Sequence, residues 1–412
     1  MAILAMALVV PTVSIVQTAK GPQLVRGGVP YTVKGAGGDT GDEGLDLLVK
    51  AGGNSIRTWG SEGIGDILDR AEKRGLTVTV GMWLGHVRHG FKWDDPAQIA
   101  AQREMVRKTV RENRDRPAVL MWALGNEMES DGNDNPRLWK EIEALAKIVK
   151  AEDPNHPVLT VTADMNKDRA RMIIENAPSL DLIGLNSYGG LVTLGQRLTD
   201  FRWKKPYIVT EFGPAGPWES PKTAWGAAIE ATSTEKAKKY EAGYEAMAKD
   251  SRCLGSYAFT WGHKQEETST WFGMLLPTGE RTESVDVATK AWTGKWPANR
   301  SPQIESLTAD QPSELEAGQA VIVALKATDA DGNPLACVWQ LVRESSDKKS
   351  GGDDEAVPQE MASTTGEALK NGASRHVFHA PKEPGAPFRV FVTVRDGKGN
   401  AAVANLPFRV KQ

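Results

Sequence analysis

Between residues 31 and 297, apolar and polar positions alternate in two different rhythms. Short runs of β-branched and aromatic residues are each followed by a longer stretch in which apolar residues recur every three or four positions, as expected for strands and amphipathic helices. In the stretch 135–154, Leu138, Ile142 and Leu145 fall on one helical face. The short runs predict eight strands, which cover residues 31–38, 54–60, 76–86, 118–127, 157–165, 181–190, 206–213 and 254–262.

Eight strands that alternate with helices predict a (β/α)8 TIM barrel over residues 31–297. Parallel strands need long crossover connections, and eight such units over about 260 residues match the size of this fold. An open doubly wound sheet is the alternative, but it more often carries a Gly-rich phosphate loop after its first strand. The sequence "KGAGGDTG" at 34–41 fits no such pattern, so we expect an α/β barrel and no nucleotide or other cofactor.

The character of the chain changes after residue 297, where helical periodicity ends. Alternating apolar runs, separated by the turn sequences "DADGN" and "DGKGN", predict a small all-β, immunoglobulin-like sandwich over residues 298–412. The charged stretch 343–363 is expected to form a polar loop. Trp339, in the strand pattern "CVWQL", is expected to pack in the sandwich core rather than bind sugar. We interpret the sandwich as a spacer or stabiliser of the barrel.

The first 30 residues form a separate N-terminal segment. Residues 1–10 are apolar, but they lack the basic region of an ordinary signal peptide, and Pro11 interrupts the run. We interpret them as a candidate remnant signal, expect no membrane span, and predict a hairpin in the alternating residues that follow. This interpretation favours a secreted, periplasmic or cell-envelope protein.

Composition and net charge narrow the kinds of partner that the protein is expected to bind. Of the 412 residues, 40% are apolar and 25% are charged, which is typical of soluble globular domains. The formal net charge of −3 gives no reason to expect nucleic acid or an anionic membrane as partner. The 13 tryptophans outnumber both the 6 tyrosines and the 9 phenylalanines, so we expect some of them to lie flat against a ligand.

The predicted strands end in polar and aromatic residues. In a TIM barrel the residues that carry out the chemistry sit at the carboxyl ends of the strands, so these positions define the candidate site. They are Arg57, Trp59, His86, Asn126, Glu127, Asp164, Asn186, Tyr188, Glu211 and Trp261.

Two of these residues are glutamates, one on the fourth predicted strand and one on the seventh. Glu127 follows "LGN" and Glu211 follows "IVT", and these strands stand on roughly opposite sides of a barrel mouth. Opening a glycosidic bond needs two carboxyl groups that flank it, one to give a proton and one to stabilise or attack the anomeric carbon. A single strand-end glutamate is more simply explained by an ion pair with arginine, whereas two in one barrel favour a glycosidase.

The sequences "WALGNE" at 122–127 and "IVTEFG" at 208–213 resemble the signatures of clan A of the glycoside hydrolases. The resemblance covers the whole predicted barrel and implies a retaining β-glycosidase with a (β/α)8 fold. It implies that Glu127 is the general acid/base and that Glu211 is the nucleophile. It also implies that Asn126 binds the sugar 2-hydroxyl next to the bond that is cleaved.

Three further strand-end residues take roles from the same resemblance. Arg57 is similar to the arginine that pairs with the nucleophile and keeps it ionised. Tyr188 is similar to the residue whose hydroxyl bonds the nucleophile, and Trp261 resembles the tryptophan that forms the floor of the sugar subsite. Four tryptophans lie at strand ends or in loops over the mouth, and some of them are expected to stack on sugar faces. They are Trp59, Trp83, Trp218 and Trp271.

The remaining candidates are less specific. His86 lies either near the substrate or against a loop carbonyl, and both alternatives stay open. His86 and His89 lack a third ligand, so we expect no catalytic metal. Glu266 and Glu267 either bond sugar hydroxyls or lie in a solvated loop, and the solvated loop is the favoured interpretation.

The favoured substrate is a β-glucan, with a β-1,3 linkage as the first candidate, because a compact barrel followed by one sandwich resembles the endo-β-1,3-glucanase branch. The expected partner is therefore an oligo- or polysaccharide. The alternatives are an exo-acting β-galactosidase or β-glucuronidase, a β-mannanase-like enzyme, a transglycosylase, and a non-catalytic carbohydrate-binding protein on the same barrel.

Overall fold

The computed structural model describes residues 10–412 except residues 131, 350, 365 and 371. It begins with a small antiparallel sheet of β1 (Val13–Thr18), β2 (Gly21–Arg26) and β3 (Val29–Pro30). β1 and β2 pair as a hairpin in the segment where the sequence predicts one. Residues 1–9, and with them most of the candidate remnant signal, lie outside the described residues.

Eight strands close into a barrel in the order β10-β11-β4-β5-β6-β7-β8-β9. Neighbouring strands from β4 to β11 run parallel. The predicted TIM barrel is therefore confirmed. Its strands are β4 (Val33–Gly38), β5 (Ser55–Arg57), β6 (Thr77–Met82), β7 (Val119–Leu124), β8 (Val158–Ala163), β9 (Leu182–Asn186), β10 (Tyr207–Phe212) and β11 (Cys253–Trp261).

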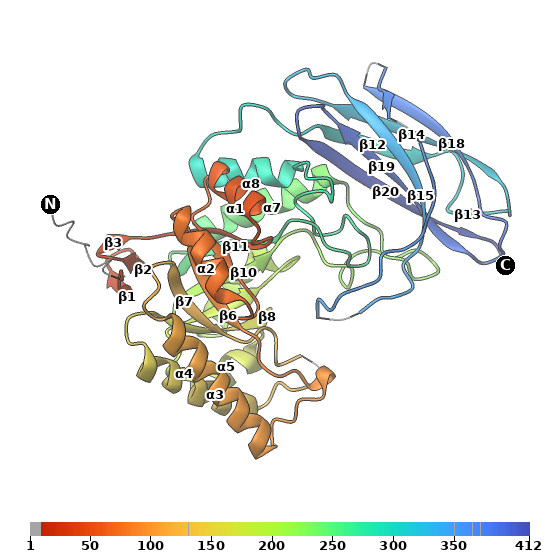
Figure 1. Cartoon of the computed structure of the whole chain (residues 1–412). Coiled ribbons are helices and arrows are strands. Elements are labelled where there is room, and N and C mark those ends of the chain that lie inside the picture. The colour runs from red at the N-terminus through yellow and green to blue at the C-terminus, as the bar shows by residue number, and fades with distance from the viewer. Residues whose placement is uncertain (1–9, 131, 350, 365, 371) are drawn as a thin grey trace. The chain divides into compact units, whose positions relative to one another are not determined.

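Each barrel strand is followed in the chain by a helix. Asp95 and Asn135 cap the first turns of α3 and α4 with side-chain oxygens, and a proline follows each cap. These two helices lie side by side (Figure 1). Within the described part of the chain, no helix has the length and apolarity of a membrane span. The helices are α1 (Asp42–Lys50), α2 (Ile64–Lys73), α3 (Pro96–Asn113), α4 (Pro136–Glu152), α5 (Lys167–Asn176), α6 (Leu194–Asp200), α7 (Ser233–Ala248) and α8 (Glu283–Thr293).

Side chains fill the interior of the barrel. The Tyr257 hydroxyl lies 2.8 Å from Ser55 Oγ and 2.5 Å from Thr79 Oγ1. A Cβ at Gly35 would come within 2.4 Å of the Tyr257 ring, so only glycine fits there. This layer pairs buried polar groups with one another and fixes the strands that carry the candidate residues at their carboxyl ends.

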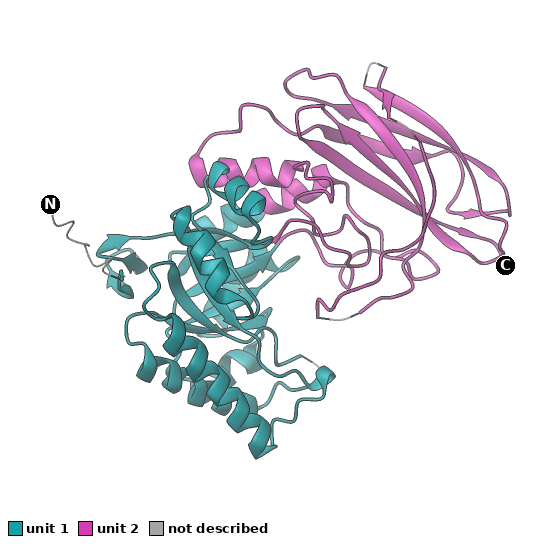
Figure 2. Cartoon of the chain, in the orientation of Figure 1, with its two compact units in different colours: residues 1–212, 243–258 teal, residues 213–242, 259–412 magenta. Residues whose placement is uncertain are grey.

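The chain divides into two compact units (Figure 2). Unit 1 comprises residues 1–212 and 243–258 and contains the barrel strands up to the middle of β11. Unit 2 comprises residues 213–242 and 259–412, so it joins the β-sandwich to the two segments that follow the last two barrel strands. The domain boundaries at residues 31 and 297 stay predictions.

Two sheets make up the β-sandwich in unit 2. One has the order β12-β14-β18, and the other has the order β13-β20-β19-β15-β16, with β17 paired to β15. The strands are β12 (Gln303–Ala309), β13 (Glu314–Leu315), β14 (Ala320–Thr328), β15 (Ala336–Arg343), β16 (Glu360–Ser363), β17 (Glu367–Ala368), β18 (Ala373–His379), β19 (Pro387–Arg395) and β20 (Ala401–Val410).

Apolar residues of both sheets share one core. Val323 and Phe378 come from the three-stranded sheet, and Trp339, Val392 and Phe408 come from the six-stranded sheet. The Trp339 side chain is 0% exposed. The prediction that this tryptophan packs in the core is therefore confirmed.

Candidate active site

Strand β7 ends at Leu124 because the backbone turns at the next residue. Gly125 adopts φ +72°, a left-handed conformation, and a Cβ there would lie 1.9 Å from Met128 Sδ. Glu127 also has a positive φ, +53°, which is uncommon for a residue with a side chain. Its N–H donates to Val161 O of β8 at 2.9 Å. The strand therefore ends in a turn that holds Asn126 and Glu127 in a fixed conformation.

Glu211, near the end of β10, is surrounded by hydrogen-bond donors. Arg57 Nη1 and Trp59 Nε1 donate to its Oε1 at 2.8 and 2.7 Å, and the Tyr188 hydroxyl donates to its Oε2 at 2.8 Å. Arg57 is only 1% exposed, so its ion pair with Glu211 is shielded from bulk water. Charge-assisted bonds of this kind stabilise negative charge on a carboxylate. The structure thus brings four predicted site residues together.

Asn126 and Asn186 connect this carboxylate to Glu127. Arg57 Nη2 donates to Asn126 Oδ1 at 2.6 Å, and Asn186 Nδ2 donates to the same oxygen at 3.1 Å. Asn186 Nδ2 also donates to Glu127 Oε1 at 2.6 Å. No role was predicted for Asn186, although its place at a strand end marked it as a candidate. Its amide is the direct link between the two halves of the site.

Glu127 differs from Glu211 in its electrostatic surroundings. Burial, and next the negative charge of Glu211, raise the pKa of Glu127 from its ordinary 4.5 to about 7. The bond from Asn186 and the positive charges of Arg57 and Arg169 act in the opposite direction and only partly offset these causes. Glu127 therefore keeps its proton up to about neutral pH. A protonated carboxyl beside an ionised one is the pair that acid catalysis with a carboxylate nucleophile requires.

His86 supports the main chain of the site. Its Nε2 lies 2.7 Å from Asn126 O, and its Nδ1 lies 3.0 Å from Leu84 O. The Trp83 ring stacks on it with the ring centroids 4.6 Å apart. Burial is the main cause that lowers the pKa of His86. Of the two alternatives that the sequence left open, the structure shows contact with backbone carbonyls, one of which belongs to a site residue.

A buried contact between Glu129 and Arg169 was not predicted. Arg169 Nη1 lies 3.1 Å from Glu129 Oε1, and the Glu129 side chain is fully buried. Burial raises the pKa of Glu129 to about 8. Arg169 also pairs with Asp134 at 2.9 Å. A second carboxyl group that holds its proton therefore follows Glu127 by two positions in the chain.

Trp261 and Trp271 belong to unit 2, whereas the two carboxyl groups belong to unit 1. Both tryptophans are buried. The Trp261 ring lies 6.1 Å from the Trp292 ring, and Trp271 Nε1 donates to Ala215 O at 2.9 Å. Their contacts with sugar stay predictions.

The prediction that Glu266 and Glu267 lie in a solvated loop was wrong. They are 8% and 7% exposed. Lys264 Nζ lies 2.9 Å from Glu266 Oε2, and Lys348 pairs with Glu267. Local sequence could not show this burial, because Lys348 comes from a part of the chain 81 positions away.

The described residues include no group of three or more His, Cys, Asp or Glu side chains that could hold a metal ion. The rings of His86 and His89 lie 5.7 Å apart, and each stacks on Trp83.

Residues 66–221 match the family model described as "Glycosyl hydrolases family 2, TIM barrel domain". Both candidate glutamates lie in this segment. This segment is similar to the barrel of glycoside hydrolases. A stretch of 65 residues is 38% identical to a β-galactosidase of Klebsiella pneumoniae and covers 16% of this chain and 6% of that protein. A stretch of 122 residues is 30% identical to a β-galactosidase of Arthrobacter sp. (strain B7), with coverage of 28% and 11%.

A solved structure, the β-glucuronidase 2 of Bacteroides uniformis, matches with a TM-score of 0.54 and 14% sequence identity. The match covers 94% of this chain and 47% of that chain. At this identity the likeness shows the fold alone. The chain thus spans about half the length of that structure, and the matched stretches span a much smaller share of the two β-galactosidases.

These findings confirm the predicted glycoside hydrolase barrel and change its finer placement. The matches include a family 2 barrel, two β-galactosidases and a β-glucuronidase. The placement near the endo-β-1,3-glucanase branch, and with it the preference for β-glucan, finds no support among them. They favour the alternative that was kept beside it, a β-galactosidase-like or β-glucuronidase-like barrel.

Proposed function

We propose that the chain is a retaining β-glycosidase in which Glu211 is the nucleophile and Glu127 is the general acid/base. One observation carries this proposal. Glu211 accepts bonds from three donors, while burial and the charge of Glu211 keep Glu127 protonated up to about pH 7. The site therefore holds an ionised and a protonated carboxyl group at the same pH.

The two steps follow from this division of charge. Glu211 attacks the anomeric carbon, the glycosidic bond breaks, and the proton of Glu127 passes to the leaving oxygen, which leaves an ester between the sugar and Glu211. Glu127, now a carboxylate, then takes a proton from water, whose oxygen attacks the anomeric carbon and releases Glu211. Glu211 carries no charge in the ester, so one cause that raises the pKa of Glu127 is removed, which favours its change from acid to base.

The remaining residues support this chemistry. Arg57, Trp59 and Tyr188 hold the nucleophile and stabilise its charge when it is released from the ester. Asn126, which accepts a bond from Arg57, is placed beside the acid/base and is the residue that we assign to the sugar 2-hydroxyl. His86 fixes the backbone at Asn126.

The proposed substrate is a β-D-galactoside or a β-D-glucuronide cleaved at the end of a glycan. The support is the identity of the matched proteins, two named as β-galactosidases and one as a β-glucuronidase. The Bacteroides uniformis enzyme is named as covalently bound to a cyclophellitol-6-carboxylate aziridine, so this compound is a direct probe for a nucleophile that accepts a uronic acid.

The test is hydrolysis of a panel of aryl β-glycosides, namely galactoside, glucuronide, glucoside and mannoside, together with a β-1,3-glucan. Wild type is expected to cleave the galactoside or the glucuronide with retention of the β-anomer in the first product, seen by NMR. Glu211→Gln is expected to lose activity on every substrate. Glu127→Gln is expected to keep activity only on substrates whose leaving group needs no proton.

The control is Glu104→Gln, which changes an exposed glutamate of α3 paired with Arg107 and is expected to leave the rates unchanged. Labelling of wild type by the aziridine at Glu211, located by peptide mass spectrometry, would identify the nucleophile directly. Full activity in Glu211→Gln would overturn the proposal. Sugar binding without turnover by wild type would favour the carbohydrate-binding alternative.

A further inference from the structure

Two segments of unit 2 directly follow barrel strands that carry predicted site residues. The segment 213–232 begins two positions after Glu211, and the segment 262–282 begins directly after Trp261. In a TIM barrel, the segments after the strands build the substrate site. Here both segments belong to the same compact unit as the sandwich. Their conformation is therefore set within unit 2.

Glu230 joins both segments to the sandwich through one buried carboxylate. Thr268 and Thr270, from the second segment, donate to it at 2.6 and 2.8 Å, and Asn405 Nδ2, from β20, donates at 2.5 Å. Lys236 of α7 forms a buried ion pair with it. Burial acts to raise the pKa of Glu230, but Lys236 and the hydrogen bonds outweigh it and lower the pKa. Glu230 is thus a fixed negative charge shared by three parts of the chain.

Arg389 of β19 reaches from the sandwich to the first segment. Its Nη2 donates to Ala228 O at 2.7 Å, and its Nη1 donates to Asn405 Oδ1 at 2.8 Å. Glu344 holds the guanidinium by accepting bonds of 2.8 Å from Nε and 3.0 Å from Nη2. Such a fork fixes the direction of the side chain, which the single ammonium of lysine cannot reproduce. The sandwich therefore sets the position of the Ala228 peptide.

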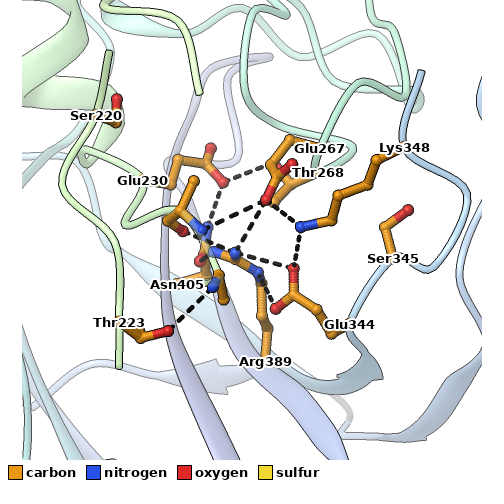
Figure 3. Close-up of polar contacts among 12 residues, drawn as sticks. Ser220, Thr223, Glu230, Glu267, Thr268, Glu344, Ser345, Lys348, Arg389 and Asn405 are labelled. Carbon is orange, nitrogen blue, oxygen red and sulfur yellow. Dashed lines mark hydrogen bonds and ion pairs between the residues drawn. The ribbon is translucent and has the colours of Figure 1, made fainter. Parts of the chain in front are cut away.

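Glu267 completes the cluster from the second segment (Figure 3). Its Oε1 accepts from Ala228 N–H at 3.5 Å, lies 3.8 Å from Arg389 Nη2 and pairs with Lys348. Its own N–H donates to Glu355 Oε2 at 2.8 Å. Its φ of +60° is a left-handed conformation that surrounding contacts must hold. Both backbone groups of Ala228 are thus hydrogen-bonded. Its oxygen accepts from Arg389 of the sandwich, and its N–H donates to Glu267 of the second segment.

The two segments also contact each other through aromatic side chains. Trp271 donates to Ala215 O at 2.9 Å, and the Trp218 ring lies 6.1 Å from the Phe272 ring. Trp218 is 60% exposed, so the first segment presents a large flat ring to solvent. An exposed ring on a segment of this kind is suited to stack on a sugar face.

We propose that the sandwich is a positioning element for the substrate site. Arg389 holds the segments 213–232 and 262–282 in the conformation that binds sugar, and Trp218 is the surface that makes the contact. This inference rests on the proposed function and replaces the interpretation of the sandwich as a spacer. The two catalytic carboxyls and their donors lie in unit 1, so loss of Arg389 weakens substrate binding and spares the chemical step.

The experiment measures kcat and KM of full-length variants on the aryl glycoside that wild type cleaves best. Arg389→Met is expected to raise KM about tenfold or more, because small displacements of binding groups have effects of this size, while kcat changes less than about twofold. Arg389→Lys is expected to recover part of this loss. The matched control, Arg343→Met, removes an exposed ion pair with Glu383 on the same sandwich and is expected to change neither constant.

This separation of the two constants distinguishes positioning from lost stability, because partial unfolding lowers the apparent kcat and leaves KM unchanged. Trp218→Ala is expected to raise KM as well, and the double variant with Arg389→Met is expected to show less than the product of the single effects. If Arg389→Met does not fold, Lys348→Met takes its place, because this half-exposed residue contacts Glu267 and Glu344. An unchanged KM in the variant that folds would overturn the inference, whereas an inactive wild type would instead count against the proposed function.

Discussion

The raised pKa of Glu127 predicts that this glutamate lowers the stability of the fold as the pH rises. Burial and the charge of Glu211 raise the pKa of Glu127 from 4.5 to about 7. The folded state therefore binds this proton more tightly than the unfolded chain does, and the free energy of unfolding falls as the pH rises from 4.5 through 7. Glu127→Gln keeps an oxygen that can accept the bond from Asn186 but carries no charge. We therefore expect the variant to be more stable than wild type above pH 7.

The magnitude follows from the difference between the two pKa values. A difference of about 2.5 corresponds to about 3 kcal/mol at pH 8, where both the folded and the unfolded wild type have lost this proton. At pH 5 the folded wild type still holds the proton, so the expected gain is below about 1 kcal/mol. For a unit of this size, about 3 kcal/mol raises the midpoint of thermal unfolding by about 6–12 °C.

The assay is thermal unfolding of wild type, Glu127→Gln and Glu104→Gln at pH 5 and pH 8, followed by circular dichroism. Glu104 is exposed, so its variant is expected to unfold like wild type at both pH values. Glu211→Gln is a second comparison, because it leaves the buried Arg57 without its carboxylate and is expected to destabilise the fold at both pH values. Equal midpoints of wild type and Glu127→Gln at pH 8 would refute the reasoning.

Three further predictions concern activity and the turn after β7. The kcat/KM of wild type is expected to fall above about pH 7, where Glu127 loses its proton, and a pH profile that stays flat to pH 9 would contradict this. Tyr188→Phe removes one bond to Glu211, the proposed nucleophile. It is expected to lower kcat/KM about 10- to 100-fold with the fold intact, as steady-state kinetics and circular dichroism can show. Gly125→Ala is expected to destabilise the fold by about 1–3 kcal/mol or more in urea unfolding, because φ is +72° and the new Cβ meets Met128. The control is Gly63→Ala, because Gly63 has φ +63° and open space around it, so this variant measures the backbone effect alone. An equal loss of stability in the two variants would refute the clash with Met128.

The barrel could be predicted because each strand is marked by its own local pattern. Strands such as β7 are buried along their whole length, and a continuous apolar run records that burial in the sequence. The strand ends were predicted less well. The fourth strand was predicted to reach residue 127, but β7 ends at Leu124 because Gly125 turns the backbone away. The second was predicted over 54–60 and is paired only over Ser55–Arg57.

The sequence predicted those contacts of the candidate site that follow from the type of a residue and its place at a strand end. The contacts of Glu211 with Arg57 and Tyr188 agree with the resemblance, since all three lie at strand ends. The residues that interact with Glu127 could not be predicted from the sequence. The amide of Asn186 and the charge of Arg169 act on it from strand and helix segments far along the chain, and only the folded barrel brings them together.

The cluster around Arg389 was beyond sequence reasoning for a different reason. Arg389 and Asn405 lie in strands of the sandwich, but their partners come from polar stretches without periodicity. The charged stretch 343–363 was expected only to form a polar loop. Lys348 nevertheless pairs with Glu267, in a segment that follows a barrel strand, and Glu344 holds Arg389, which donates to Ala228 O in another. Charged residues near a loop are normally solvated, and only burial reveals that these carry ion pairs between distant segments.

The two residues after Gly125, an amide and a carboxyl group, bond to different parts of the site. Asn126 accepts a bond from Arg57, which in turn bonds Glu211, whereas Glu127 accepts its bond from Asn186. One peptide unit thus connects the amide bonded to Arg57, which pairs with Glu211, to the glutamate whose pKa Glu211 raises. The left-handed conformations of Gly125 and Glu127 are what allow neighbours in the chain to serve both carboxyl groups. A change in this turn is therefore expected to alter both the charges around Glu211 and the proton affinity of Glu127, and not only the stability of the strand.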